Sequence, residues 1–199
     1  MSEPHDEAAA RPVVEQGLIH HGKVFDVVTD RVDLGGAAPV VREYTTHPGA
    51  VAVIALDDED RVLLLTQYRH PVRRVLWEPP AGLLDVPGEP ELQAARRELA
   101  EEADLVAGRW WRLASFFTSP GASDEHLTVF LARDLTAVPD GTAFRREDEE
   151  ADMVPAWVPL EDAVGRVLDG SLESPTTVVG VLAAAAAKAR GWESATPVS

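Results

Sequence analysis

Apolar residues gather along the chain in short runs that predict β-strands. Two largely apolar runs cover 50–56 and 61–68, and such segments are typical of central strands that are buried on both faces. The acidic turn 57–60 between them is expected to be solvated. The same reasoning places three strands before these two, at 13–20, 23–34 and 38–45, and three after them, at 110–118, 126–133 and 153–158. The three N-terminal strands form a sheet too small to be stable without a partner surface.

Helical periodicity is clearest from Pro90 to Ala103, a stretch without a helix breaker. Proline suits the first turn of a helix, where its missing N–H would have no partner. Two further helices are predicted, one at 160–169 and one that begins with Ser174 as its N-cap and ends near Gly191. The alanine run 183–187 indicates that the last helix is closely packed or lies at an interface.

The 90–103 helix carries two adjacent arcs of opposite character. At roughly 100° per residue the apolar arc holds Leu92, Ala95, Leu99 and Ala103, and the acidic arc holds Glu91, Glu98, Glu101 and Glu102. Like charges at these spacings repel, and Arg97 offsets only part of the repulsion. A rigid set of carboxylates suits Mg²⁺ or Mn²⁺, which keep several waters and are completed by substrate phosphates. The alternative is an ordinary solvated charged face.

Composition narrows the classes of function. The 199 residues are 45% hydrophobic, which suffices for a buried core, and no apolar run is long enough to cross a membrane. Zero cysteines, together with the lack of a secretory signal, are typical of a cytoplasmic protein. A net charge of −16 repels nucleic acid, and it also repels a free diphosphate. A phosphorylated substrate would therefore need bound divalent cations or a few placed arginines.

The stretch around this helix resembles the signature of the Nudix hydrolases. The matching positions are Gly82, Glu89, Arg97, Glu98, Leu99, Glu101, Glu102 and Leu105. Six residues, instead of five, separate Gly82 from Glu89, and they lie in a turn before the helix. Asp104 stands where the signature has glycine. Aspartate tolerates the left-handed conformation better than most residues, so a similar helix end is expected at a small energetic cost.

The resemblance implies an α/β Nudix fold, with a mixed β-sheet between helices and a small N-terminal antiparallel β region. Residues 1–12 are polar and alanine-rich and are expected to be a disordered tail. The resemblance implies a β region at 13–46 that exchanges between the subunits of a homodimer and a Nudix hydrolase domain at 47–191, which leaves a C-terminal tail at 192–199. By the same resemblance the metal ligands are Glu98, Glu101, Glu102 and the backbone carbonyl of Ala81. Arg97 and Glu101 are implied to take part in catalysis, and Glu89 to orient Arg97.

Flanking segments resemble those of the ADP-ribose pyrophosphatases within this family. Arg69 and Glu78 are implied to contact the substrate, and Arg73 and Arg74 lie between them in a predicted loop beside aromatic residues. Arginines in such a setting suit recognition of a diphosphate and a base. Trp77 is interpreted as a core residue.

Two further segments bear on the substrate and on the catalytic base. Pro120 lies where these enzymes have a proline that recognises ADP-ribose, and Ser123 and Asp124 either bind the terminal ribose or cap the turn. Glu150, with Glu149 as the alternative, is implied to supply a loop carboxylate to catalysis, as metal ligand or general base.

The combined hypothesis is metal-dependent hydrolysis of a nucleoside diphosphate sugar, with ADP-ribose giving AMP and ribose 5-phosphate. GDP-mannose, NADH and dinucleoside polyphosphates remain alternative substrates, because the signature supports the diphosphate chemistry common to all of them. A catalytically silent module that binds a nucleotide to regulate a partner is the alternative from another functional class.

Overall fold

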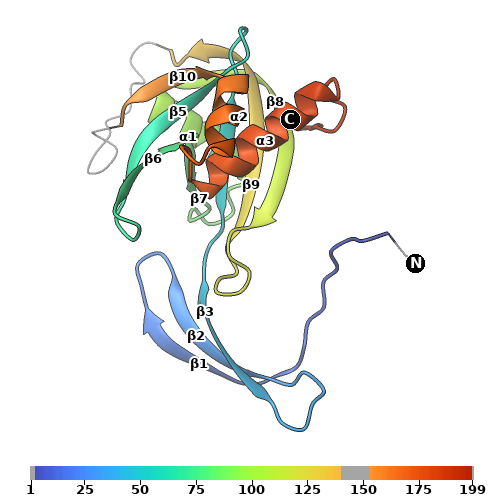
Figure 1. Ribbon diagram of the computed structural model, residues 1–199. Coiled ribbons are helices and arrows are strands. Elements are labelled where there is room, and N and C mark those ends of the chain that lie inside the picture. Colours follow the sequence, from blue (N-terminus) through green and yellow to red (C-terminus); the bar gives the residue numbers. More distant parts are fainter. Residues whose placement is uncertain (1–2, 140–152, 199) are drawn as a thin grey trace. The chain divides into compact units, whose positions relative to one another are not determined.

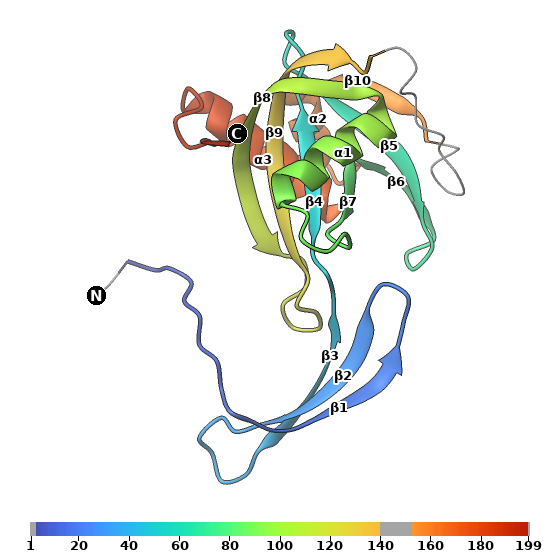
Figure 2. The ribbon, with the colours of Figure 1, turned by 180° about the vertical axis from the view of Figure 1, so that it is seen from behind.

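The structure, a computed structural model, describes residues 3–139 and 153–198. The chain divides into two compact units, each described here by itself: residues 1–48 with 119–125, and residues 49–118 with 126–199. Figure 1 shows the elements from one side and Figure 2 from the opposite side. None of the helices in the described part of the chain is both long and apolar enough to span a membrane.

The smaller unit is a three-stranded antiparallel sheet in the order β1-β2-β3. Its strands are β1 (Val13–His21), β2 (Asp26–Val32) and β3 (Val40–Thr46). Segment 119–125 belongs to this unit because the Thr45 N–H donates to the Ala122 carbonyl at 2.9 Å, and the Asp124 carboxylate accepts the His47 N–H at 2.7 Å. The sheet is therefore completed by residues that are far from it in sequence.

The larger unit contains two sheets and three helices. One sheet has the order β11-β8-β9-β4-β7, and the other β10-β5-β6. The strands are β4 (Ala50–Ala55), β5 (Arg61–Arg69), β6 (Arg74–Glu78), β7 (Ala81–Leu83), β8 (Leu105–Phe117), β9 (His126–Ala137), β10 (Pro155–Pro159) and β11 (Thr196–Val198), and the helices are α1 (Glu91–Ala103), α2 (Leu160–Leu168) and α3 (Pro175–Ala189). The five-stranded sheet is mixed because β4 runs parallel to β9 and antiparallel to β7.

Alternate residues of β4 belong to two hydrophobic clusters, as expected for a strand buried on both faces. Ala52 and Ile54 pack in a cluster with α2 and α3, whereas Val51 and Val53 pack in a cluster with α1. Helices α2 and α3 are seen in front of the sheets in Figure 1, and α1 in Figure 2. The predicted mixed sheet between helices, with an antiparallel N-terminal region, is confirmed.

Several local predictions need correction. Strands β6, β7 and β11 were not predicted; they have three to five residues and depend on pairing with partners elsewhere in the chain. Arg74 therefore begins an edge strand and does not lie in a loop. Pro90 is the N-cap of α1, which leaves the arcs unchanged. Ser174 is the N-cap of α3 as predicted, but its side chain makes no capping hydrogen bond there.

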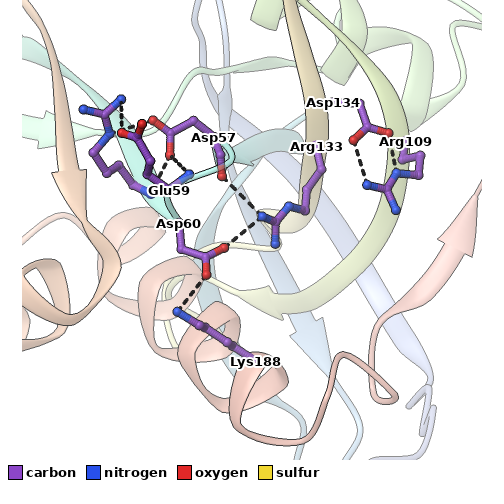
Figure 3. A network of polar contacts seen from close by, with 8 residues as sticks. Asp57, Glu59, Asp60, Arg109, Arg133, Asp134 and Lys188 are labelled. Atoms are coloured by element: carbon purple, nitrogen blue, oxygen red, sulfur yellow. Dashed lines mark hydrogen bonds and ion pairs between the residues drawn. The ribbon is translucent and has the colours of Figure 1, made fainter.

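The acidic turn between β4 and β5 is not merely solvated, as the sequence suggested. Asp60 pairs with the Arg133 guanidinium at 2.8 Å and with the Lys188 ammonium at 2.9 Å, and Arg133 also donates to the Asp57 carbonyl (Figure 3). These contacts join the turn to β9 and to the end of α3. The bond from Lys188, followed by the charge of Arg133, lowers the pKa of Asp60 below its ordinary value of 3.8.

We expect Asp60→Asn to lower the free energy of unfolding by about 1 kcal/mol near neutral pH, because it removes a partly buried carboxylate with two cationic partners. Since the folded state lowers the Asp60 pKa, this contribution is complete above 3.8 and is lost as the pH falls through the lower folded value. Urea unfolding at neutral and at acidic pH measures the difference.

Asp58→Asn is the matched control, because Asp58 is exposed in the same turn. It is expected to change the unfolding free energy little at either pH. Equal effects of the two substitutions at neutral pH would contradict a stabilising role for the Asp60 pairs.

Candidate active site on helix α1

The acidic arc of α1 is not a solvated face. Glu98 is only 8% exposed and Glu102 only 7%, and they lie on the helix beside Ala94, Ala95 and Leu99, which are fully buried. Carboxylates are seldom buried to this extent unless charged or hydrogen-bonding partners compensate for the lost water. The arrangement of α1 thus favours a functional site over the alternative of an ordinary charged surface.

Arg97 connects three glutamates. Its guanidinium binds Glu89 through two hydrogen bonds of 3.2 and 3.0 Å, and its Nη1 donates to Glu98 at 2.6 Å and to Glu101 at 3.2 Å. The bonds to Glu89, followed by the charge of Glu98, raise the pKa of Arg97 above its ordinary value. One cation therefore orients two of the proposed metal ligands, and Glu89 holds that cation, as the sequence suggested.

Glu102 faces β7. The Ala81 N–H donates to its Oε2 at 2.9 Å. In an extended strand the N–H and C=O of one residue point to the same side, so the Ala81 carbonyl lies on this outer edge of β7 as well. The structure thus brings Glu102 and the carbonyl that was predicted as a ligand to one edge of the sheet.

Gly82 is required by the close approach of α1 to β7. A Cβ atom built at this position would lie 1.9 Å from Glu98 Oε1 and 2.1 Å from Glu98 Cδ. No such contact is sterically possible, so any side chain at position 82 must displace the Glu98 carboxylate. The glycine of the signature therefore creates the space in which Glu98 sits.

The donor set suits a hard divalent cation, because glutamate and carbonyl oxygens are the ligands that Mg²⁺ and Mn²⁺ prefer. Within residues 3–139 and 153–198, no three or more histidine, aspartate or glutamate side chains already form a group that could hold a metal ion. Glu98 and Glu102 bond instead to Arg97 and to the Ala81 N–H. Mg²⁺ commonly uses one or two protein carboxylates plus waters and substrate phosphates, so these residues fit such an ion without forming a complete protein cage.

Arg69 and Glu78 form a second polar centre, on the β5–β6 hairpin. The Arg69 guanidinium donates to both oxygens of the Glu78 carboxylate, at 3.1 and 2.6 Å. The Glu78 side chain is 6% exposed and that of Arg69 45% exposed. Glu78 is therefore a buried acceptor that orients a partly exposed cation through a bidentate pair.

Arg73 and Arg74 lie next to each other in sequence but make different contacts. Arg74 forms an ion pair with Glu173, in which both side chains are half exposed. Arg73 lies in the turn before β6 with φ of 55°, and its N–H donates to the Arg69 carbonyl. Trp77 packs against the cluster that includes α2 and α3, in agreement with its interpretation as a core residue.

The remaining predicted residues lie on other segments of the chain. Pro120, Ser123 and Asp124 belong to the N-terminal unit. There the Ser123 hydroxyl accepts the Glu125 N–H, which is a contact within the turn, whereas the Asp124 carboxylate accepts the His47 N–H from 77 residues away. Glu149 and Glu150 lie outside the described residues.

Thr177 on α3 was not singled out from the sequence. It is fully buried, and its hydroxyl donates to the Trp77 carbonyl at 2.7 Å across 100 residues of sequence. No local pattern reveals such a contact, because a threonine in the first turn of a helix is unremarkable in a sequence. Glu91, at the start of the acidic arc, bonds to Arg112 of β8.

Comparison with known proteins identifies the family of this chain. A model of the NUDIX domain matches residues 46–176. The ADP-ribose pyrophosphatase of Mycobacterium tuberculosis is 44% identical over 170 residues, 85% of this chain and 81% of the relative. The ADP-ribose pyrophosphatase of Bacillus subtilis is 40% identical over 147 residues, 73% of this chain and 77% of the relative.

Two more similarities extend the comparison. The methanol dehydrogenase activator of Bacillus methanolicus is 34% identical over 163 residues, 82% of this chain and 86% of the relative. A crystal structure of an ADP compounds hydrolase matches with a TM-score of 0.74 at 19% identity, covering 96% of this chain and 100% of that one, a likeness of fold. The family match and the two pyrophosphatase relatives, together with the signature on α1, lead to one conclusion: the chain belongs to the Nudix family.

Proposed function

We propose that this protein hydrolyses the diphosphate bond of ADP-ribose to AMP and ribose 5-phosphate. The observation that carries the proposal is the pair of buried carboxylates, Glu98 and Glu102, held against β7 on the signature helix of a Nudix enzyme. Two relatives that are at least 40% identical over most of this chain are named ADP-ribose pyrophosphatase, which supports the choice of substrate. GDP-mannose, NADH and dinucleoside polyphosphates are the alternative substrates.

Nudix ADP-ribose pyrophosphatases depend on a divalent metal, and we propose Mg²⁺ or Mn²⁺ here. Glu98, Glu101, Glu102 and the Ala81 carbonyl would hold it. When bound, such an ion neutralises the diphosphate oxygens and lowers the pKa of the attacking water. Glu150, or Glu149, is the proposed loop carboxylate that accepts the proton of this water.

The described residues then have separate tasks. Arg97 orients the Glu98 and Glu101 carboxylates, because its Nη1 donates a hydrogen bond to each of them. Arg69 binds the anionic part of the substrate and is itself held by Glu78. Arg73 and Arg74 are proposed to contact the substrate from the same hairpin, and Pro120, Ser123 and Asp124 from segment 119–125.

A homodimer is also proposed, through the N-terminal sheet. This sheet has three strands, and β1 exposes Val14 at 61%, Leu18 at 62% and Ile19 at 52%. A small sheet with so much exposed apolar surface gains stability when a second copy covers it.

The substrate proposal is tested by incubating the protein with Mg²⁺ or Mn²⁺ and a panel containing ADP-ribose and the alternative substrates. ADP-ribose is expected to give the highest kcat/KM, with AMP and ribose 5-phosphate as products. Performing the reaction in ¹⁸O-water reveals which phosphorus is attacked. A higher kcat/KM for another diphosphate would contradict the proposed substrate but not the proposed hydrolysis of a diphosphate bond.

Calorimetry addresses the regulatory alternative, which one relative named as a methanol dehydrogenase activator favours. Tight binding of ADP-ribose without product formation, with either metal ion, would contradict the hydrolase proposal and support a regulatory module.

Glu98→Gln and Glu102→Gln are each expected to lower kcat by about 10²–10⁴-fold, because each removes a charge that stabilises the transition state through the bound cation. Glu91→Gln is the matched control: it removes a carboxylate of the same helix that is paired with Arg112, and it is expected to retain near-wild-type turnover. Turnover by both test variants close to that of the wild type at saturating Mg²⁺ would exclude the mechanism.

The dimer proposal predicts that Leu18→Arg converts the protein to a monomer in sedimentation equilibrium, because a buried unpaired guanidinium is unfavourable at an apolar interface. Leu168→Arg is the control, since Leu168 is 75% exposed on α2 in the other unit and is expected to leave the mass unchanged. A wild-type protein that sediments as a monomer at all concentrations would contradict the proposal.

A further inference from the structure

We propose that Thr177 is a positioning residue for Arg69, and that it acts through the Trp77–Glu78 peptide and the Glu78 carboxylate. The inference rests on the proposed function, in which Arg69 binds the anionic part of the substrate. It concerns a contact between α3 and the edge strand β6 that lies outside the Nudix signature.

The register of the β5–β6 pair shows why the Trp77 carbonyl needs a partner outside the sheet. Thr66 lies opposite Trp77, and the Thr66 N–H donates to the Val154 carbonyl, on the side away from β6. In an antiparallel pair, opposed residues either both face each other or both face outward. The Trp77 carbonyl therefore points out from the edge strand, where the Thr177 hydroxyl donates to it at 2.7 Å.

This bond fixes the peptide unit on which Glu78 depends. The Trp77 carbonyl and the Glu78 N–H belong to one rigid plane, so a hydrogen bond to the carbonyl sets the orientation of the Glu78 backbone. On the other side, Pro79 restricts Glu78 to extended conformations. Glu78 is thus held from both sides, by Thr177 before it and by Pro79 after it.

Both ends of this connection, Thr177 and Glu78, are buried. Thr177 is fully buried and Glu78 is 5% exposed, so neither group can exchange its partner for water without a local opening of the structure. Glu78 in turn holds Arg69 by two hydrogen bonds. A bidentate pair transmits the direction of the carboxylate plane to the guanidinium plane. The orientation of a partly exposed arginine is therefore set by a buried hydroxyl on α3.

The test compares Thr177→Val, which keeps the shape and removes the hydroxyl, with Thr177→Ser, which keeps the hydroxyl. Thr128→Val is the matched control, because Thr128 is also fully buried and its hydroxyl has no hydrogen-bond partner among the described residues. Thr177→Val is expected to raise the KM for ADP-ribose about tenfold, which corresponds to one buried hydrogen bond. Its kcat is expected to stay within about twofold of wild type, as are both parameters of Thr177→Ser and Thr128→Val.

Coupling to Arg69 separates positioning from general stability. Arg69→Gln alone is expected to raise KM, and adding Thr177→Val to it is expected to change KM by less than about twofold, because the group that Thr177 positions is already absent. Independent effects that multiply in the double variant would overturn the inference, as would an unchanged KM in Thr177→Val.

A spectroscopic readout does not depend on turnover. The Arg69 Nε–H signal, assigned by its disappearance in Arg69→Gln, is expected to shift in ¹H–¹⁵N spectra of Thr177→Val and to stay in place in Thr128→Val. An unshifted signal in Thr177→Val would overturn the positioning role. A wild-type protein that leaves ADP-ribose intact would contradict the proposed function, while this spectrum would still decide whether Thr177 positions Arg69.

Discussion

The burial of two carboxylates between α1 and β7 is the constraint to which the rest of the site responds. Glu98 and Glu102 lose most of their water when the apolar arc of α1 packs on the sheet, so each needs a compensating donor close by. Arg97 and the Ala81 N–H supply these donors, and Gly82 supplies the space. A short edge strand and a single arginine are therefore as necessary to the arrangement as the glutamates themselves.

The net charge of −16 gives this arrangement its context. A protein with this net charge repels a diphosphate, so cationic groups are needed where such a ligand binds. Arg97 is hydrogen-bonded to three glutamates, so the proposed attraction of anions rests on Arg69, Arg73 and Arg74 and on a bound divalent ion. Arg69 and the ion both depend on buried glutamates: Glu78 orients the arginine, and the α1 pair would retain the metal. Buried carboxylates therefore determine where the cationic groups of the site lie.

Sequence reasoning succeeded where the controlling interactions are local. The arcs of α1 follow from helical periodicity, and the left-handed Asp104, with φ of 54° and ψ of 34°, ends the helix as expected for a residue in place of glycine. It failed where partners are distant. Asp60 meets Arg133 and Lys188 across at least 73 residues, β7 is too short to carry a periodic signal, and the hydroxyl of Thr177 reaches a carbonyl 100 residues away. Propensity and spacing contain no information on such pairings.

The contribution of segment 119–125 to the N-terminal sheet has a consequence for how the chain assembles. The three strands of that sheet are synthesised first, yet Thr45 and His47 find their partners in Ala122 and Asp124 only after more than a third of the chain has followed. Contacts of such long range delay folding, because the intervening loop must close before they form. Neither unit is a continuous piece of chain. A protein truncated to begin after residue 48 would therefore not be one complete unit, because it would keep segment 119–125 but lose the sheet to which that segment belongs.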